Sequence, residues 1–211
     1  MAADDFTVLF GNDEQTIVDP ASYQYFNHLL NYRTIILNKE VDETIVEHVA
    51  IPLLDFEKDS SNDPVTLIIS TVGGSPCDGL FLCNIIDNYK KPLNIVILGY
   101  AASMGTILLA AGAHNPNVTK KCYPFSHALL HAGFSAISGE TLSAEDTMAF
   151  NKRINDKIKT FIITHTKISE EEYVQNERKQ WFFDADDLYR YGFIDEIIGK
   201  EDDKVEVLEE E

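Results

Sequence analysis

The chain has 211 residues, of which 45% are hydrophobic and 25% charged, so it is long enough to enclose a core and has the composition of a globular protein. Its formal net charge of −18 argues against nucleic acid or an anionic membrane as a partner. Because it shows no membrane-length apolar run, no secretion signal and no metal-ligand spacing of cysteine or histidine, we expect a cytoplasmic protein without a metal site.

The first half of the chain alternates between apolar strands and helical patterns. A mixed, polar segment over residues 1–20 reads as an arm, and a helical spacing follows over Pro20–Asn31. Strands are then predicted at Arg33–Leu37, Val65–Ser70 and Leu93–Leu98, and helices at Asp42–Asp55, Asp78–Tyr89 and Ser103–Ala111. Pro52 is awkward inside the pattern over Asp42–Asp55, where it can kink or shorten the helix. Strands that are apolar on both faces and alternate with helices predict an α/β protein with a parallel sheet.

The second half combines one long helical pattern with shorter elements. The long pattern covers Gly139–His165, and its apolar stripe fits either a core helix or a helix that pairs with a neighbouring subunit. The shorter elements are strands at Cys122–Phe125, Ala128–His131 and Phe193–Gly199, an aromatic cluster at Trp181–Phe183, and capped helices starting at Ser169 and Asp184. Beyond Lys200 the tail is acidic, and we expect it to be disordered.

Two glycine- or serine-containing turns follow predicted strands. Gly73-Gly74 comes after the second strand, and Ser103 stands where the third strand passes into a helix. Ligands of parallel sheets bind at such strand ends, so both turns can face one site. Ser103 is then either a helix N-cap or a nucleophile. His131, at the end of a short apolar run, is either structural or the base that a serine nucleophile needs.

Five stretches, in the same order, resemble the proteolytic subunit of Clp protease, the ClpP family of self-compartmentalising serine peptidases. They are Tyr32–Leu37, Ile69–Gly74, Gly99–Gly105, Ser126–His131 and Tyr191–Asp195. The resemblance runs from about Tyr25 to Ile198. It implies a ClpP/crotonase-like α/β fold of repeated β-β-α/β-α units. The implied organisation is an axial loop or arm over 1–20, a peptidase domain over 21–199 with a handle helix at about 139–166, and an acidic tail over 200–211.

The resemblance also implies roles for single residues. Ser103 is the nucleophile, His131 is the general base, and the backbone amides of Gly74 and Met104 form the oxyanion hole. The substrate groove is bordered by Gly73, Ser75, Gly133 and Phe134.

The chain departs from the family at the third member of the catalytic triad, which in the family is an aspartate. Counting back from Ala185 places Gln180 there, and counting forward from Glu177 places Lys179 there. Gln180 can accept a hydrogen bond from the histidine, although it brings no charge. Asp184 is the alternative if the loop is rearranged.

These observations predict a serine endopeptidase that hydrolyses unfolded polypeptides through an acyl-enzyme on Ser103. The resemblance implies a heptameric ring, single or stacked in pairs, and the absence of a GxxxxGK[ST] motif implies a separate AAA+ unfoldase as the ATP-driven partner. No cofactor is expected. One alternative is a ring subunit with weak or no activity because the triad acid is replaced. The other is an acyl-CoA enzyme of the crotonase fold, which has no use for the motif around Ser103.

Overall fold

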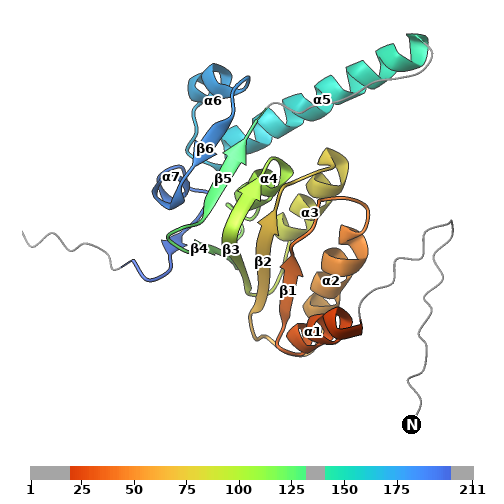
Figure 1. Cartoon of the computed structure of the whole chain (residues 1–211), viewed down its shortest axis with the longest axis vertical. Helices are drawn as coiled ribbons and strands as arrows, with labels where there is room; N and C mark the ends of the chain where they lie inside the picture. Colours follow the sequence, from red (N-terminus) through yellow and green to blue (C-terminus); the bar gives the residue numbers. More distant parts are fainter. Residues whose placement is uncertain (1–19, 132–140, 201–211) are drawn as a thin grey trace, which may run out of the picture.

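The computed structural model describes residues 20–131 and 141–200. Its strands are β1 (Thr34–Leu37), β2 (Val65–Thr71), β3 (Leu93–Ala102), β4 (Val118–Cys122), β5 (His127–Leu130), β6 (Trp181–Phe183) and β7 (Glu196–Ile197). The order β1-β2-β3-β4-β7 forms a parallel sheet, as the alternating pattern predicts (Figure 1). β5 pairs with β3 in parallel, and β6 pairs with β5 in antiparallel orientation.

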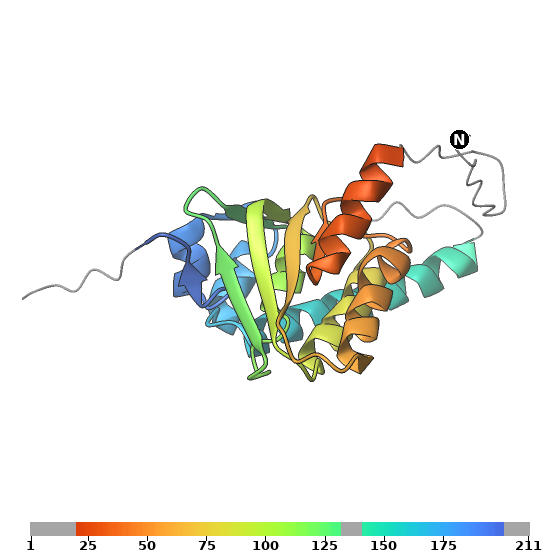
Figure 2. The ribbon, with the colours of Figure 1, turned by 90° about the horizontal axis from the view of Figure 1, so that it is seen from below.

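The helices are α1 (Pro20–Asn31), the π-helix η1 (Val46–Ala50), α2 (Ile51–Lys58), α3 (Pro76–Asp87), α4 (Met104–Ala110), α5 (Thr141–His165), α6 (Glu170–Asn176) and α7 (Ala185–Arg190). Figures 1 and 2 show α2, α3 and α4 along one side of the sheet. Every residue of α4 is buried, because it is built from small and apolar side chains. Among the described residues, no helix is long and apolar enough to cross a membrane.

Strand β3 changes its neighbour halfway along its length, and this change positions the site. Its first half, Leu93–Ile97, pairs with β4, and its last residues, Tyr100–Ala102, pair with β5. Gly99, at a φ of +85°, lies between the two halves. The strand therefore runs on to Ala102 rather than ending at Leu98, and it carries its carboxyl end past the rest of the sheet to meet β5.

Three further predicted elements are wrong in their bounds. The helix expected over Asp42–Asp55 is replaced by η1 and α2, because Pro52 is accommodated in the first turn of a helix that starts at Ile51. The strand expected over Cys122–Phe125 ends at Cys122, and the Phe125 side chain is 94% exposed. The strand expected over Phe193–Gly199 is reduced to Glu196–Ile197.

Helix α5 projects beyond the sheet (Figure 1). Near its C-terminal end Ile162 is fully buried in the core, so the core-helix prediction holds for that part. Nearer its N-terminal end Met148 and Phe150 are 61% and 45% exposed. Large apolar side chains in water are characteristic of a surface that another chain covers.

The turns that follow β2 and β3 lie against each other. Gly73 has a φ of +94°, and a Cβ on it would lie 2.5 Å from the Ala102 carbonyl oxygen and 2.8 Å from the Met104 nitrogen. On its other side, the Val41 amide donates a 2.8 Å hydrogen bond to the Gly73 carbonyl. Glycine at this position therefore satisfies both a backbone and a steric requirement.

Replacing Gly73 by alanine is expected to destabilise the fold by about 2–5 kcal/mol, because the positive φ and the close contacts both oppose a Cβ. Gly99→Ala is the matched control: its φ of +85° is similar, but a Cβ there meets nothing within 4 Å, so the cost is about 1–2 kcal/mol. Urea unfolding of both variants measures the difference. An equal loss in the free energy of unfolding for both variants would show that the turns after β2 and β3 are not tightly packed against each other.

A charge cluster fixes the loop between α2 and β2. Lys91 Nζ donates to the Asp59 carboxylate at 2.7 Å, and the Arg33 guanidinium donates to the same carboxylate. These hydrogen bonds, that of Lys91 first, lower the pKa of the Asp59 carboxyl from 3.8 to about 2. The Arg33 guanidinium also lies 4.7 Å from the centre of the Phe56 ring. The cluster thus ties the end of α2 to the residues that precede β1 and β3.

The stabilisation contributed by Asp59 is expected to be full above pH 4 and to disappear as the pH falls through about 2, because the folded state holds this carboxyl ionised. Asp59→Asn is therefore expected to lower the melting temperature at pH 7 and at pH 5, with a smaller deficit at pH 2.5. Asp55→Asn, an exposed neighbour in the same helix, is the control and should change little. A deficit that is undiminished at pH 2.5 would refute this assignment.

Candidate active site

Ser103 occupies a strained turn between β3 and α4. It has a φ of +52°, and Arg33 is the other described non-glycine residue with a positive φ. Such a conformation costs on the order of 1–3 kcal/mol and persists where the surroundings enforce it. Ser103 holds the N-cap position of α4, but its side chain makes no capping hydrogen bond to that helix. The hydroxyl is left available for chemistry.

Strand β5 holds this turn in place from the other side. The Ser103 amide donates a 2.7 Å hydrogen bond to the Leu129 carbonyl. The buried Thr106 hydroxyl donates toward the carbonyls of Ala101, at 2.9 Å, and Leu129, at 2.8 Å. His131 follows Leu129 by two residues. The hydrogen bonds that shape the serine turn therefore also fix the strand that carries the histidine.

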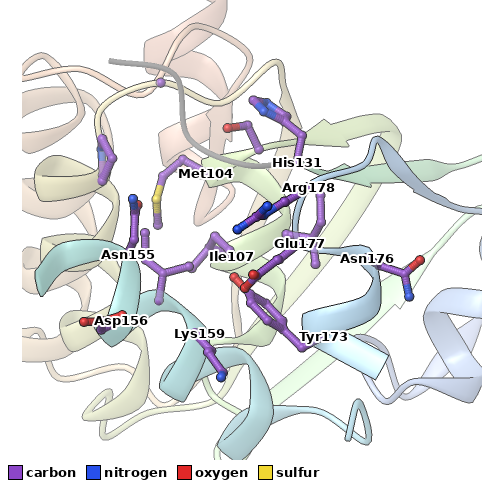
Figure 3. A pocket seen from close by; sticks show the side chains of 15 residues that line it. Met104, Ile107, His131, Asn155, Asp156, Lys159, Tyr173, Asn176, Glu177 and Arg178 are labelled. Atoms are coloured by element: carbon purple, nitrogen blue, oxygen red, sulfur yellow. The ribbon is translucent and has the colours of Figure 1, made fainter. Parts of the chain in front are cut away.

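Ser103 and His131 line one cavity of about 300 Å³, shown in Figure 3. Gly74 and Met104 line it as well, so four of the residues assigned from the sequence meet at one place. Among the described residues, no acceptor takes the amide hydrogen of Gly74 or Met104. An arrangement of hydroxyl, imidazole and two open amides can support nucleophilic attack on a carbonyl carbon and bind the resulting oxyanion.

Helices α4, α5 and α6, with the residues that follow α6, supply most of the remaining wall, and Leu130 of β5 and Pro76 of α3 complete it. Its apolar part consists of Ile107, Leu130, Ile158 and Tyr173, and its polar part consists of Asn155, Asp156, Lys159, Asn176, Glu177 and Arg178. Lys159 pairs with Glu170 at 2.7 Å, and this contact raises the pKa of the lysine and lowers that of the glutamate. Burial, and then the charge of Glu177, raise the pKa of the Tyr173 hydroxyl.

Neither residue considered for the third triad position lies in the cavity wall. Gln180 is exposed and immediately precedes β6. Asp184 caps α7, and its carboxylate accepts a 2.8 Å hydrogen bond from the Asp187 amide. The residues of this stretch that do line the cavity are Asn176–Arg178, at the end of α6. One sequence signal pointed there: the capping box of Ser169 and Glu172 starts a short helix that ends at Asn176.

Of the four residues predicted to border the substrate groove, the structure describes two. Gly73 is buried under the serine turn, and its contacts are with that turn rather than with the cavity. Ser75 caps α3 by accepting a 3.4 Å hydrogen bond from the Asp78 amide. Gly133 and Phe134 lie outside the described residues. Over residues 20–131 and 141–200, no group of three or more histidine, cysteine or acidic side chains could hold a metal ion.

Comparison with known proteins agrees with this geometry. The family model described as "Clp protease" matches residues 17–201. A relative from Bacillus licheniformis, the ATP-dependent Clp protease proteolytic subunit 2, is 27% identical over 185 residues, which is 88% of this chain and 96% of that protein. The match spans the parallel sheet, the serine turn, β5 and the helices that close the cavity. The chain belongs to the Clp protease family.

Proposed function

We propose that this chain is a serine endopeptidase in which Ser103 is the nucleophile and His131 the general base. The observation that carries the proposal is the Ser103 turn, whose hydroxyl is not used as a helix cap and which shares a cavity with His131, Gly74 and Met104. A serine held on a strained strand-to-helix turn is typical of enzymes that attack acyl groups. Membership of the Clp protease family supports the same type of function.

The proposed reaction proceeds through an acyl-enzyme. His131 takes the proton from Ser103 Oγ as this oxygen attacks the peptide carbonyl carbon, and the amides of Gly74 and Met104 hold the oxyanion. The protonated imidazole then gives its proton to the departing amine, and the C–N bond breaks. Water, activated by the same imidazole, hydrolyses the ester. The apolar wall of Met104, Ile107 and Ile158 accommodates an apolar substrate side chain.

The proposed substrate is an unfolded polypeptide that enters a chamber formed by a heptameric ring or a stacked pair of rings. The Bacillus relative is by its name the proteolytic subunit of an ATP-dependent protease. Because this chain has no Walker-type phosphate-binding motif, we assign the ATP-driven step to a separate AAA+ unfoldase. One observation favours the alternative of a ring subunit with weak activity: neither Gln180 nor Asp184 lies in the cavity wall.

A fluorophosphonate probe tests the nucleophile. The full-length chain is expected to be labelled at Ser103, and Ser103→Ala should abolish labelling. His131→Ala should slow labelling by about 10²–10⁴-fold, the usual contribution of a general base. Ser60→Ala, which removes an exposed hydroxyl from the loop after α2, is the control and should be labelled at the wild-type rate. An assembled ring that resists the probe would favour the weakly active subunit.

Light scattering tests the assembly. The solution mass is expected to equal seven or fourteen chains of 23.8 kDa each. Because Met148 and Phe150 are exposed on α5, replacing both by glutamate should convert a double ring to a single one. Lys152→Gln, on the exposed surface of the same helix, should leave the mass unchanged. A wild-type chain that remains monomeric at every concentration would contradict the ring.

A further inference from the structure

The hydroxyl of Thr106 connects the two strands that precede Ser103 and His131. Thr106 is fully buried in the first turn of α4, and it does not line the cavity of the candidate site. We infer that Thr106 is a positioning residue: its hydroxyl fixes β3 to β5 and thereby sets the direction in which Ser103 Oγ points. The inference rests on the proposed function, and it adds to the site a residue that does not touch the substrate.

The place of Thr106 in α4 directs its side chain toward these strands. It is the third residue of the helix, and the Cα–Cβ bonds of a helix tilt toward its N-terminus. A threonine inside a helix usually bonds to the carbonyl three or four residues before it. Here the hydroxyl oxygen instead lies 2.9 Å from the Ala101 carbonyl oxygen, in β3, and 2.8 Å from that of Leu129, in β5. Its single hydrogen is therefore shared between two strands.

Thr106 also closes a circuit of hydrogen bonds around the strained serine. The Thr106 amide donates to the Ser103 carbonyl at 3.0 Å, and the Ser103 amide donates to the Leu129 carbonyl at 2.7 Å. The same Leu129 carbonyl accepts from the Thr106 hydroxyl. Both backbone polar groups of Ser103 are thus engaged while its φ is +52°. Rotation about the Cα–Cβ bond is then the main freedom left to the Ser103 hydroxyl.

Burial makes the loss of this hydroxyl consequential for the turn. Thr106 is 0% exposed, so water from the solvent does not take over its hydrogen bonds when the hydroxyl is removed. The net contribution of one such bond corresponds to about twofold to tenfold in an equilibrium constant. A strained backbone persists only where its surroundings enforce it. Without the hydroxyl, the Ser103 turn is expected to relax away from its positive φ and to misplace Oγ.

The test compares Thr106→Val, which removes the hydroxyl, with Thr106→Ser, which retains it. In the full-length protein, Thr106→Val should slow fluorophosphonate labelling of Ser103 and lower kcat for a fluorogenic peptide, each by about tenfold. KM should stay within about twofold, because the Thr106 side chain does not line the cavity. Thr106→Ser should remain within about threefold of the wild type in labelling rate and kcat. Hydrogen exchange at the Ser103 amide should be faster in Thr106→Val than in Thr106→Ser.

Thr166→Val is the matched control, because it removes a threonine hydroxyl from a part of the fold that does not line the cavity. The Thr166 hydroxyl donates to the Ile162 carbonyl at 2.7 Å and accepts from the Ile168 amide at 3.1 Å, just beyond the end of α5. This variant should be labelled, and should cleave the peptide, at the wild-type rate. Melting temperatures of all variants separate a loss of activity from a loss of folding. If valine prevents folding at position 106, Thr106→Ala removes the same hydroxyl without changing the expected result.

Every other outcome contradicts the inference in its own way. Wild-type labelling and kcat in folded Thr106→Val would show that the hydroxyl does not position Ser103, and the proposed function would stand. An equal loss in Thr106→Ser would assign the effect to the shape of the side chain, and an equal loss in Thr166→Val would assign it to general destabilisation. A wild-type protein that does not react at Ser103 would overturn the proposed function together with the inference.

Discussion

The close approach of two backbone turns is the constraint on which the site depends. Gly73 lies so near the carbonyl of Ala102 and the amide of Met104 that no side chain fits between them. This packing brings Gly74, whose φ is +151°, and the first amide of α4 to the same cavity. A peptide carbonyl placed there meets two amide donors that take no acceptor among residues 20–131 and 141–200. In the proposed mechanism, the geometry of oxyanion binding is thus set by backbone packing rather than by side chains.

Hydrogen bonds between neighbouring elements also maintain the strained conformation of Ser103. A positive φ at Ser103 is unfavourable on its own, and hydrogen bonds from the Ser103 amide and the Thr106 hydroxyl offset it by joining this region to β3 and β5. These bonds require β3 to extend to Ala102 and to change its neighbour from β4 to β5. His131 directly follows the strand that makes this connection, and it lines the same cavity as Ser103. The proposed nucleophile and the proposed base therefore lie on elements that are hydrogen-bonded to each other.

Features encoded by nearby residues were predictable from the sequence. The strands are continuous apolar runs, the α6 start is a Ser-Glu capping box, and the Asp184 cap is followed by a helix that ends near Gly192. The helix and strand bounds that were predicted wrongly depend on packing. Pro52 shifts the start of a helix, and the chain leaves the sheet after Cys122 although Tyr123 and Phe125 are aromatic. The segment Asn176–Arg178 was missed as part of the cavity wall because the tertiary fold alone brings it to the cavity of Ser103 and His131. Counting positions along the sequence from Ala185 or Glu177 cannot show which residues the tertiary fold brings to the cavity.

The central claim is that Ser103 forms a covalent intermediate in a site assembled by these two turns. Rapid mixing of the full-length protein with a chromogenic ester tests it most directly. The account predicts a burst of one leaving group per chain, followed by slower steady turnover, and no burst in Ser103→Ala. Linear release without a burst, at a rate that Ser103→Ala leaves unchanged, would contradict it.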